Sequence, residues 1–254
     1  MKTKIRTPFF EVGVKNYIYG DDVLQLAIAA DKTAKKYDID VLFTAPYTEI
    51  RRVAEHTNRL IIMAPYMDVL RPGRGQADVL PEAVKAAGAK GVTVNHCERP
   101  MTLSAIKKTI DRAHELDMFV FACADTIAES QAIAQLHPDI INPEPTDLIG
   151  SGNVSDMSYV MESVRVIRAI YPDILVEQAA GITNAQQVYD FIMAGSDAAG
   201  AASGIVNATD PLKMLDEMVY AVRRAADELY NNGSDCLQSQ HTVISRREIC
   251  SPPD

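Results

Sequence analysis

Short apolar runs alternate with longer amphipathic segments along the first 230 residues of the chain. Runs rich in β-branched and aromatic side chains are typical of strands, and apolar positions spaced three or four residues apart are typical of helices. The pattern therefore predicts a regular succession of βα units. The predicted strands are residues 9–17, 40–45, 60–65, 91–97, 119–124, 140–143, 174–178 and 197–202.

Amphipathic segments fill the gaps between these strands. Thr102 and Asp210 stand where helix N-caps are expected, and Pro211 fits the first turn of the helix that follows Asp210. The predicted helices are residues 21–37, 48–57, 81–87, 102–116, 126–136, 156–170, 184–193 and 211–231.

Strands that are apolar on both faces indicate a parallel sheet, and eight βα units close most naturally into a single (β/α)8 barrel. The alternative is an open, doubly wound sheet, which the absence of a GxGxxG motif after the first strand makes less favourable. We expect one domain over residues 1–231. Residues 232–254, which open with Asn232-Gly233-Ser234, are predicted to form a C-terminal tail. The sequence leaves open whether this tail is flexible or contacts a partner.

Composition narrows the range of partners. The 254-residue chain has a formal net charge of −9, which disfavours nucleic acid but still allows a small anion to bind local N–H groups. Its four cysteines are far apart and form neither a zinc spacing nor a disulfide framework, as expected for a reduced cytoplasm. The sequence has no signal-peptide core and no apolar run near the ~18 residues of a membrane span. We therefore expect a cytoplasmic protein without membrane or nucleic-acid partners.

Candidate chemistry lies at the ends of three predicted strands, which in such a barrel meet at one mouth. Lys15 ends the first strand, His96 ends the fourth, and Glu144 follows the sixth. A carboxylate roofed by a short loop suits proton abstraction next to a carbonyl group. A lone glutamate after a strand is more often a loop residue or a helix cap, but the three residues together suggest a sugar-phosphate isomerase.

Strand alternation predicts which neighbours share a face at the fourth strand. His96 and Glu98 should point together, and Asn95 and Cys97 should point away, so that Cys97 is not expected to contact His96. By the same rule Lys15 shares a face with Gly13. An inward lysine needs a nearby anion, which Glu98 or a bound phosphate could supply.

Six motifs at these strand ends resemble the triosephosphate isomerase family, in its shorter archaeal branch, and the resemblance covers about residues 9–230. It implies a TIM barrel and an intramolecular oxidoreductase, an aldose–ketose isomerase of central carbohydrate metabolism. The motifs are Lys15-Asn16-Tyr17, Val79-Leu80-Pro81-Glu82-Ala83-Val84, Asn95-His96-Cys97-Glu98, Glu144-Pro145-Thr146-Asp147-Leu148-Ile149-Gly150-Ser151-Gly152, Ala180-Gly181-Ile182 and Ala202-Ser203-Gly204-Ile205.

The resemblance also implies the role of each residue. This family is known to pair a glutamate base with a neutral histidine, so these roles would fall to Glu144 and His96. Lys15, held by Glu98, would stabilise the enediolate charge. None of these steps requires a metal or an organic cofactor.

The resemblance further implies a lid and a phosphate site. The lid comprises Pro145, Thr146, Asp147, Leu148, Ile149, Gly150, Ser151 and Gly152. Backbone N–H groups of Gly150, Gly181, Ser203 and Gly204 are expected to bind the phosphate of a small phosphorylated sugar.

Three departures from the family pattern affect the expected substrate. Gly13 stands where the family usually has asparagine, which removes an amide and leaves extra room, Cys97 replaces a serine, and Pro143 replaces a valine. Glyceraldehyde 3-phosphate and dihydroxyacetone phosphate are the leading pair, and Gly13 makes a tetrose or branched sugar phosphate a contender.

Two other classes of function stay open. One is a Schiff-base aldolase or lyase acting through Lys15, and the other is a non-catalytic paralogue that binds a phosphorylated metabolite. The resemblance also implies a homodimer or homotetramer, with the turn-rich loop at residues 71–75 as a candidate contact.

Overall fold

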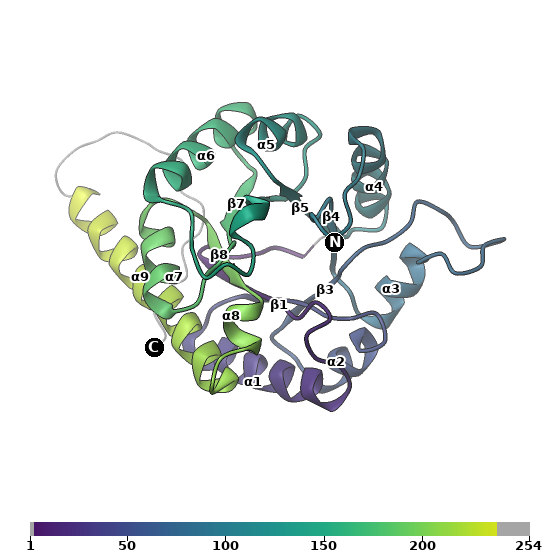
Figure 1. Ribbon diagram of the computed structural model, residues 1–254, viewed down its shortest axis with the longest axis horizontal. Coiled ribbons are helices and arrows are strands. Elements are labelled where there is room, and N and C mark those ends of the chain that lie inside the picture. The colour runs from purple at the N-terminus through teal and green to yellow at the C-terminus, as the bar shows by residue number, and fades with distance from the viewer. Residues whose placement is uncertain (1–2, 238–254) are drawn as a thin grey trace.

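The apolar runs form parallel strands that close into a barrel in chain order, with β1 paired to both β2 and β8 (Figure 1). The computed structural model of the chain describes residues 3–237, and describes side chains as far as residue 231. This confirms the predicted single (β/α)8 TIM barrel. The strands are β1 (Phe9–Gly13), β2 (Val41–Thr44), β3 (Ile61–Ala64), β4 (Gly91–Val94), β5 (Phe119–Ala124), β6 (Ile140–Pro143), β7 (Leu175–Gln178) and β8 (Ala198–Ala201).

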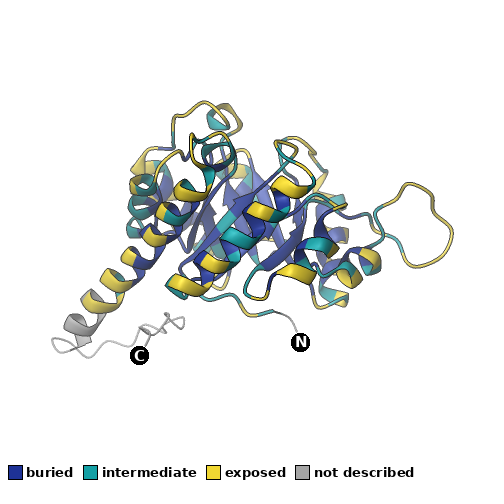
Figure 2. Ribbon diagram, turned by 90° about the horizontal axis from the view of Figure 1, so that it is seen from below, coloured by how far each residue is buried: buried dark blue, intermediate teal, exposed yellow. Residues whose placement is uncertain are grey.

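Helices surround the barrel with their apolar faces inward and their exposed faces outward (Figure 2). Thr102 and Asp210 act as N-caps as predicted: Thr102 Oγ1 accepts a hydrogen bond from Ala105 N, and Asp210 Oδ1 accepts one from Lys213 N. The helices are α1 (Asp21–Tyr37), α2 (Ile50–His56), α3 (Pro81–Ala87), α4 (Leu103–Glu115), α5 (Ile127–Ala134), η1 (Thr146–Leu148), α6 (Met157–Ile170), α7 (Ala185–Met193), α8 (Ser203–Val206) and α9 (Pro211–Leu237).

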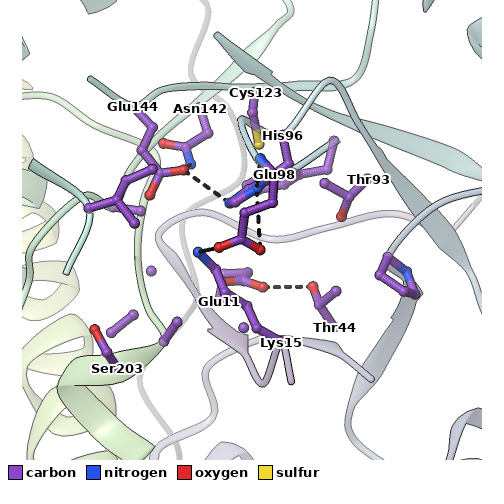
Figure 3. A pocket seen from close by; sticks show the side chains of 18 of the residues that line it. Glu11, Lys15, Thr44, Thr93, His96, Glu98, Cys123, Asn142, Glu144 and Ser203 are labelled. Carbon is purple, nitrogen blue, oxygen red and sulfur yellow. Dashed lines mark hydrogen bonds and ion pairs between the residues drawn. The ribbon is translucent and has the colours of Figure 1, made fainter. Parts of the chain in front are cut away.

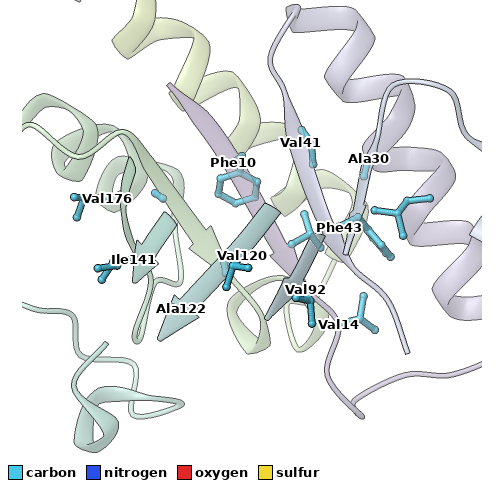
Figure 4. Close-up of a cluster of buried hydrophobic side chains, with 14 of the residues drawn as sticks. Phe10, Val14, Ala30, Val41, Phe43, Val92, Val120, Ala122, Ile141 and Val176 are labelled. Carbon is cyan, nitrogen blue, oxygen red and sulfur yellow. The ribbon is translucent and has the colours of Figure 1, made fainter. Parts of the chain in front are cut away.

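Alternation along each strand produces two hydrophobic layers. Side chains such as Phe10, Phe43 and Val120 point outward and pack between the strands and the helices (Figure 4). Side chains such as Phe9 and Phe119 point inward and fill the base of the barrel. Each fully buried apolar side chain contributes about 1.5–3 kcal/mol, so these layers supply most of the stability that holds the strand ends in place.

The upper part of the barrel interior is polar. Glu11 and Glu177 follow the inward alternation of Phe9 and Leu175, above the apolar base. Glu177 is fully buried, and neither of its carboxyl oxygens has a hydrogen-bond partner among the described residues. Burial raises the pKa of Glu177 well above its usual value, and the nearby charges of Glu11 and Glu144 raise it further. The sequence analysis did not single out either residue.

Two strands end well before their predicted C-terminal residues, while β2, β3, β7 and β8 differ from the prediction by only one residue at either end. β1 ends at Gly13 because Lys15 has a φ of 49°, and β4 ends at Val94 because Asn95 has a φ of 58°. Left-handed residues cannot continue a strand, so Lys15 and His96 lie on the loops just beyond it.

The last helix is longer than predicted. Helix α9 continues past Asn231 to Leu237, through the Asn232-Gly233-Ser234 stretch that was expected to end it. A helical glycine costs about 1 kcal/mol, which a long, well-packed helix can bear. The rest of the predicted tail, residues 238–254, lies outside the described residues.

Two further features concern the surface. The loop between β3 and α3, which contains residues 71–75, extends away from the barrel (Figures 1 and 2). Of the helices in the described part of the chain, none combines the length and the apolar character needed to cross a bilayer.

The buried carboxyl group of Glu177 gives the first prediction. Its pKa is raised in the folded protein, so the unfolded chain releases this proton at a lower pH, and Glu177 makes folding less favourable as pH rises above about 4.5. Glu177→Gln keeps the size of the side chain without the ionisation. We expect it to raise the free energy of unfolding by about 1–3 kcal/mol at pH 8 and by much less at pH 4.5, measured by urea denaturation.

Glu217→Gln provides the control, because this glutamate is exposed and pairs only loosely with Lys213, at 3.7 Å. Its effect should stay within about 0.5 kcal/mol at both pH values. A Glu177→Gln variant that is equally or less stable at pH 8 would contradict the assigned burial cost.

Candidate active site

A cavity of about 350 Å³ opens at the carboxyl ends of the strands. Lys15, His96 and Glu144 all line it, although they follow β1, β4 and β6 and are far apart in the sequence (Figure 3). The barrel therefore brings together the three side chains that the sequence analysis predicted to converge.

Glu144 directly follows β6 and is only 9% exposed. Its Oε1 accepts a hydrogen bond from Ala180 N at 3.2 Å, and its Oε2 accepts one from Asn142 Nδ2 at 3.2 Å. Burial raises the pKa of Glu144, although the charge of Lys15 and the hydrogen bond from Ala180 work in the opposite direction. The result is a carboxylate that is fixed in position and more basic than one in water.

His96 faces Glu144 across the cavity. Its Nδ1 accepts a hydrogen bond from Glu98 N at 3.1 Å, so the neutral ring carries its proton on Nε2. Nε2 lies 3.8 Å from Glu144 Oε2. Burial lowers the pKa of His96, and the charge of Lys15 lowers it further. The ring is therefore a neutral hydrogen-bond donor directed into the site.

Asn95 holds the loop that carries His96. Asparagine tolerates the left-handed conformation that this position requires. Its Oδ1 accepts a hydrogen bond from Met101 N at 2.8 Å, and its Nδ2 donates to Cys123 O at 3.0 Å and to Glu129 Oε1 at 2.9 Å. The sequence analysis predicted only that Asn95 points away from His96 and did not identify it as a positioning residue.

The prediction that Cys97 would not contact His96 is wrong. Cys97 Sγ lies 3.7 Å from His96 Nδ1. The left-handed turn at Asn95 ends the strand, so the alternation that separated the two side chains no longer applies beyond Val94.

Lys15 pairs with Glu98, as predicted. The distance from Nζ to Oε1 is 3.1 Å, and the lysine side chain is 20% exposed. Burial alone would lower the pKa of Lys15, but the hydrogen bond to Glu98 and the charges of Glu144 and Glu98 outweigh it and raise the pKa. Lys15 is therefore a permanent cation beside Glu144.

The predicted lid begins immediately after Glu144 and contains the short helix η1. Of its residues, Ile149 and Gly150 line the cavity. The loop is braced by Ser151 Oγ, which donates a hydrogen bond to Leu148 O at 2.9 Å. The other predicted lid residues, Pro145, Thr146, Asp147, Leu148, Ser151 and Gly152, are not among the residues that line the cavity.

Gly181 is where the lid meets the rest of the barrel. Gly181 has a φ of 78°, and a Cβ there would collide with the carbonyl group of Asn153, just after the lid, and would lie 3.1 Å from the carbonyl oxygen of Leu148 within it. Glycine is therefore required on both conformational and steric grounds.

The predicted anion-binding groups are only partly confirmed as cavity residues. Gly150, Gly181 and Ser203 line the cavity, whereas Gly204 does not. Gly204 instead packs against the carbonyl group of Ile182, where a Cβ would collide. Ser203 begins α8, and the first N–H groups of a helix have no partner within the helix, so they are available to an anion.

Gly13 lines the cavity, but the room it leaves is bounded by Glu11. A Cβ at Gly13 would lie 3.4 Å from both carboxyl oxygens of Glu11. Thr44 Oγ1 donates a hydrogen bond to Glu11 Oε1 at 2.7 Å, and burial raises the pKa of Glu11 to about 7. A single acidic residue at an inward position of an apolar strand was the signal in the sequence that could have identified it.

No group of three His, Cys, Asp or Glu side chains within residues 3–231 is arranged to hold a metal ion. The polar groups of the cavity include a base, Glu144, a neutral donor, His96, and a cation, Lys15, together with the glycine-rich backbone at Gly150 and Gly181. This set can accept a proton, polarise a carbonyl group and stabilise a negative charge.

Comparison with known proteins places this chain in a family. The family model described as triosephosphate isomerase matches residues 12–210. The triosephosphate isomerase of Methanoculleus marisnigri is 33% identical over 84% of this chain and 98% of its own length, and that of Methanothermus fervidus is 32% identical over 79% and 91%. The triosephosphate isomerase of Sulfurisphaera tokodaii is 29% identical over 88% of this chain and 99% of its own length. This chain therefore belongs to the triosephosphate isomerase family.

Proposed function

We propose that this chain interconverts glyceraldehyde 3-phosphate and dihydroxyacetone phosphate through an enediolate, with Glu144 as the base. The observation that carries the proposal is the position of Glu144, buried and held by Ala180 N and Asn142 Nδ2, with His96 Nε2 3.8 Å away. Membership of the family supports the reaction class, an aldose–ketose isomerisation.

Each step uses a group that lines the cavity. Glu144 removes a proton from the carbon next to the carbonyl group and returns it to the neighbouring carbon. His96 donates a hydrogen bond from Nε2 to the carbonyl oxygen and moves protons between the two oxygens. Lys15 stabilises the negative charge of the enediolate. The overall reaction consumes no other reactant.

The phosphate is expected on the side of the cavity formed by the loops after β7 and β8, away from His96. The loops after β7 and β8 and the first turn of a short extra helix are a common phosphate site in barrels of this kind. Gly181 and Ser203 occupy these places, and Gly150 approaches from the lid. Closure of residues 145–152 over the phosphate would exclude water and strengthen Glu144 as a base.

Lys15 favours an isomerase over a Schiff-base aldolase. A lysine that attacks a carbonyl group must be neutral, and its pKa is therefore usually lowered. The pKa of Lys15 is raised by its hydrogen bond to Glu98 in spite of burial. Borohydride treatment with substrate should therefore leave the mass of the protein unchanged, whereas a covalent adduct on Lys15 would support the aldolase.

The assembly of the protein belongs to the proposal as well. We propose a homodimer or homotetramer in the cytoplasm, with the protruding loop at residues 71–75 as a contact. Sedimentation of the full chain would test this, since a strictly monomeric protein would contradict it.

Glu144 gives the direct test of the mechanism. Glu144→Gln removes the base but keeps the shape, and we expect kcat on glyceraldehyde 3-phosphate to fall about 10²–10⁴-fold. Glu144→Asp keeps the carboxylate but moves it away from the substrate, and it should also lower kcat, by a smaller factor. A rate unchanged by both substitutions would show that Glu144 is not the base.

The pH dependence of kcat/KM should reflect the raised pKa of Glu144. Activity requires the carboxylate, so the acid limb of the profile should lie above pH 4.5 and rise with pH. His96 should not add a limb above its usual pKa of 6.5, because its pKa is lowered and the ring is neutral there.

Asp125 contributes to the raised pKa of Glu144, so Asp125→Asn should move the acid limb to lower pH at low salt. A limb at or below pH 4.5 would contradict the burial effect.

Gly181 tests the role of the lid. Gly181→Ala places a methyl group against the carbonyl of Asn153 and strains the backbone, so the lid should be displaced. A displacement near 1 Å can cost about 10²-fold, and we expect a loss of that order in kcat/KM. Gly195→Ala is a matched control, because Gly195 has a φ of 108° and open space around it, so it carries the backbone strain without touching the lid. Equal losses of activity in the two variants would contradict the role of Gly181 in holding the lid.

A further inference from the structure

The floor of the cavity is unusually polar for the interior of a barrel. Glu11, Thr44, Thr93 and Asn142 all line it, from β1, β2, β4 and β6 (Figure 3). The strands are parallel and their carboxyl ends form the mouth of the barrel, so these four residues, which lie within the strands, form a layer deeper than Lys15, His96 and Glu144, which follow the strands. The enediolate chemistry of the proposed function uses none of these four side chains directly.

This layer offers hydrogen-bond acceptors that protein donors leave unoccupied. Thr44 donates a hydrogen bond to Oε1 of Glu11, and no side chain among the described residues donates one to Oε2. Asn142 uses its Nδ2 to hold Glu144, while its buried Oδ1 has no partner within residues 3–231. Asn142 Oδ1 is buried, whereas Glu11 is only half-buried and lines the cavity. The free oxygen of Glu11 is therefore the acceptor that a donor on a ligand can reach.

Two glycines give the ligand access to this layer. Gly13 and Gly200 line the cavity, and both carboxyl oxygens of Glu11 lie within 3.4 Å of the position that a Cβ on Gly13 would occupy. A side chain at position 13 would stand between the catalytic residues and Glu11. Its absence leaves Glu11 facing the cavity.

The charges around the floor define what can bind there. Glu11 lies close enough to Glu144 for the charge of Glu144 to raise its pKa, and the charges of both raise the pKa of Glu177. An anionic group would therefore be repelled from the floor. The phosphate must therefore stay on the side of Gly181 and Ser203. A neutral hydroxyl group, which can donate to Glu11, fits the floor.

We propose that the active site also isomerises phosphorylated sugars with one more hydroxylated carbon than a triose, and that Glu11 is the specificity-determining residue that binds the added hydroxyl group. This inference rests on the proposed function. The added carbon is attached to the reacting carbon farther from the phosphate. A proton still leaves one carbon and returns to its neighbour through an enediolate, but both partners are now ketoses, because the carbonyl group moves from C2 of a tetrulose 1-phosphate to the adjacent carbon. With four carbons, the substrate is a tetrulose phosphate.

The test compares erythrulose 1-phosphate with dihydroxyacetone phosphate, using the purified full-length chain. The readout is the ratio of the two kcat/KM values. Glu11→Leu removes both acceptors at similar volume, and the ratio should fall about 10- to 100-fold, the usual effect of losing one hydrogen bond in a closed site. Glu11→Gln keeps an acceptor and should restore most of the ratio. Gly13→Ala places a methyl group over Glu11 and should lower the ratio as well.

Glu177→Gln is the matched control. Glu177 is another buried carboxyl group of the barrel interior, but it does not line the cavity, so its substitution should leave the ratio unchanged. Circular dichroism of each variant separates a change in specificity from a failure to fold.

The outcomes distinguish this inference from the proposed function. Turnover of dihydroxyacetone phosphate without turnover of erythrulose 1-phosphate would overturn the inference and leave the proposed function intact. A ratio that Glu11→Leu does not change would overturn the role of Glu11. Turnover of erythrulose 1-phosphate that survives Glu144→Gln would instead contradict the proposed mechanism.

Discussion

The site depends on keeping the positive charge of Lys15 close to Glu144 without pairing the two. Lys15 binds Glu98 at 3.1 Å, and Glu144 is held by an N–H group of the backbone and an amide of Asn142. If Lys15 bound Glu144 directly, the pair would lower the pKa of the carboxylate and weaken it as a base. In the proposed mechanism, Glu98 thus allows one cation to stabilise the enediolate while the buried carboxylate keeps its basicity.

This arrangement places several acidic groups inside one barrel. Glu11, Glu144 and Glu177 all have raised pKa values, and burial is the first cause for each. Each opposes folding above its unfolded pKa, and the apolar layers on both faces of the strands must offset that cost. The proposed reaction accounts for Glu144. The proposed binding of a substrate hydroxyl group accounts for Glu11, and Glu177 lies next to Gly200 on the same side of the barrel interior.

The sequence predicted the elements better than their ends. Periodicity located every barrel strand, and the bounds of β5 and β6 agree with the structure. It failed at Lys15 and Asn95, because a left-handed residue ends a strand without changing the apolar pattern. The same turn at Asn95 explains why Cys97 lies near His96. Helix α9 continues through Gly233 because the packing of a helix outweighs the low helix propensity of one residue.

The sequence predicted the residues of the candidate site that follow the strands but missed those within the strands. Lys15, His96, Glu98 and Glu144 were identified from strand ends and from the resemblance to a family, and they lie together as expected. Glu11 and Asn142 were missed because they lie within strands, where polar residues carry no motif. Only the closed barrel shows that they share a floor with the catalytic residues.

In the proposed mechanism a carboxylate moves a proton between two adjacent carbons. Proton NMR of the reaction in D2O tests it most directly, by following the hydrogen bound to the carbon next to the carbonyl group. The account predicts that solvent deuterium enters at this one carbon during turnover, because the proton held by Glu144 exchanges before it is returned. Isomerisation in which the substrate hydrogen is retained in full would indicate direct hydride transfer between the carbons and would contradict the account.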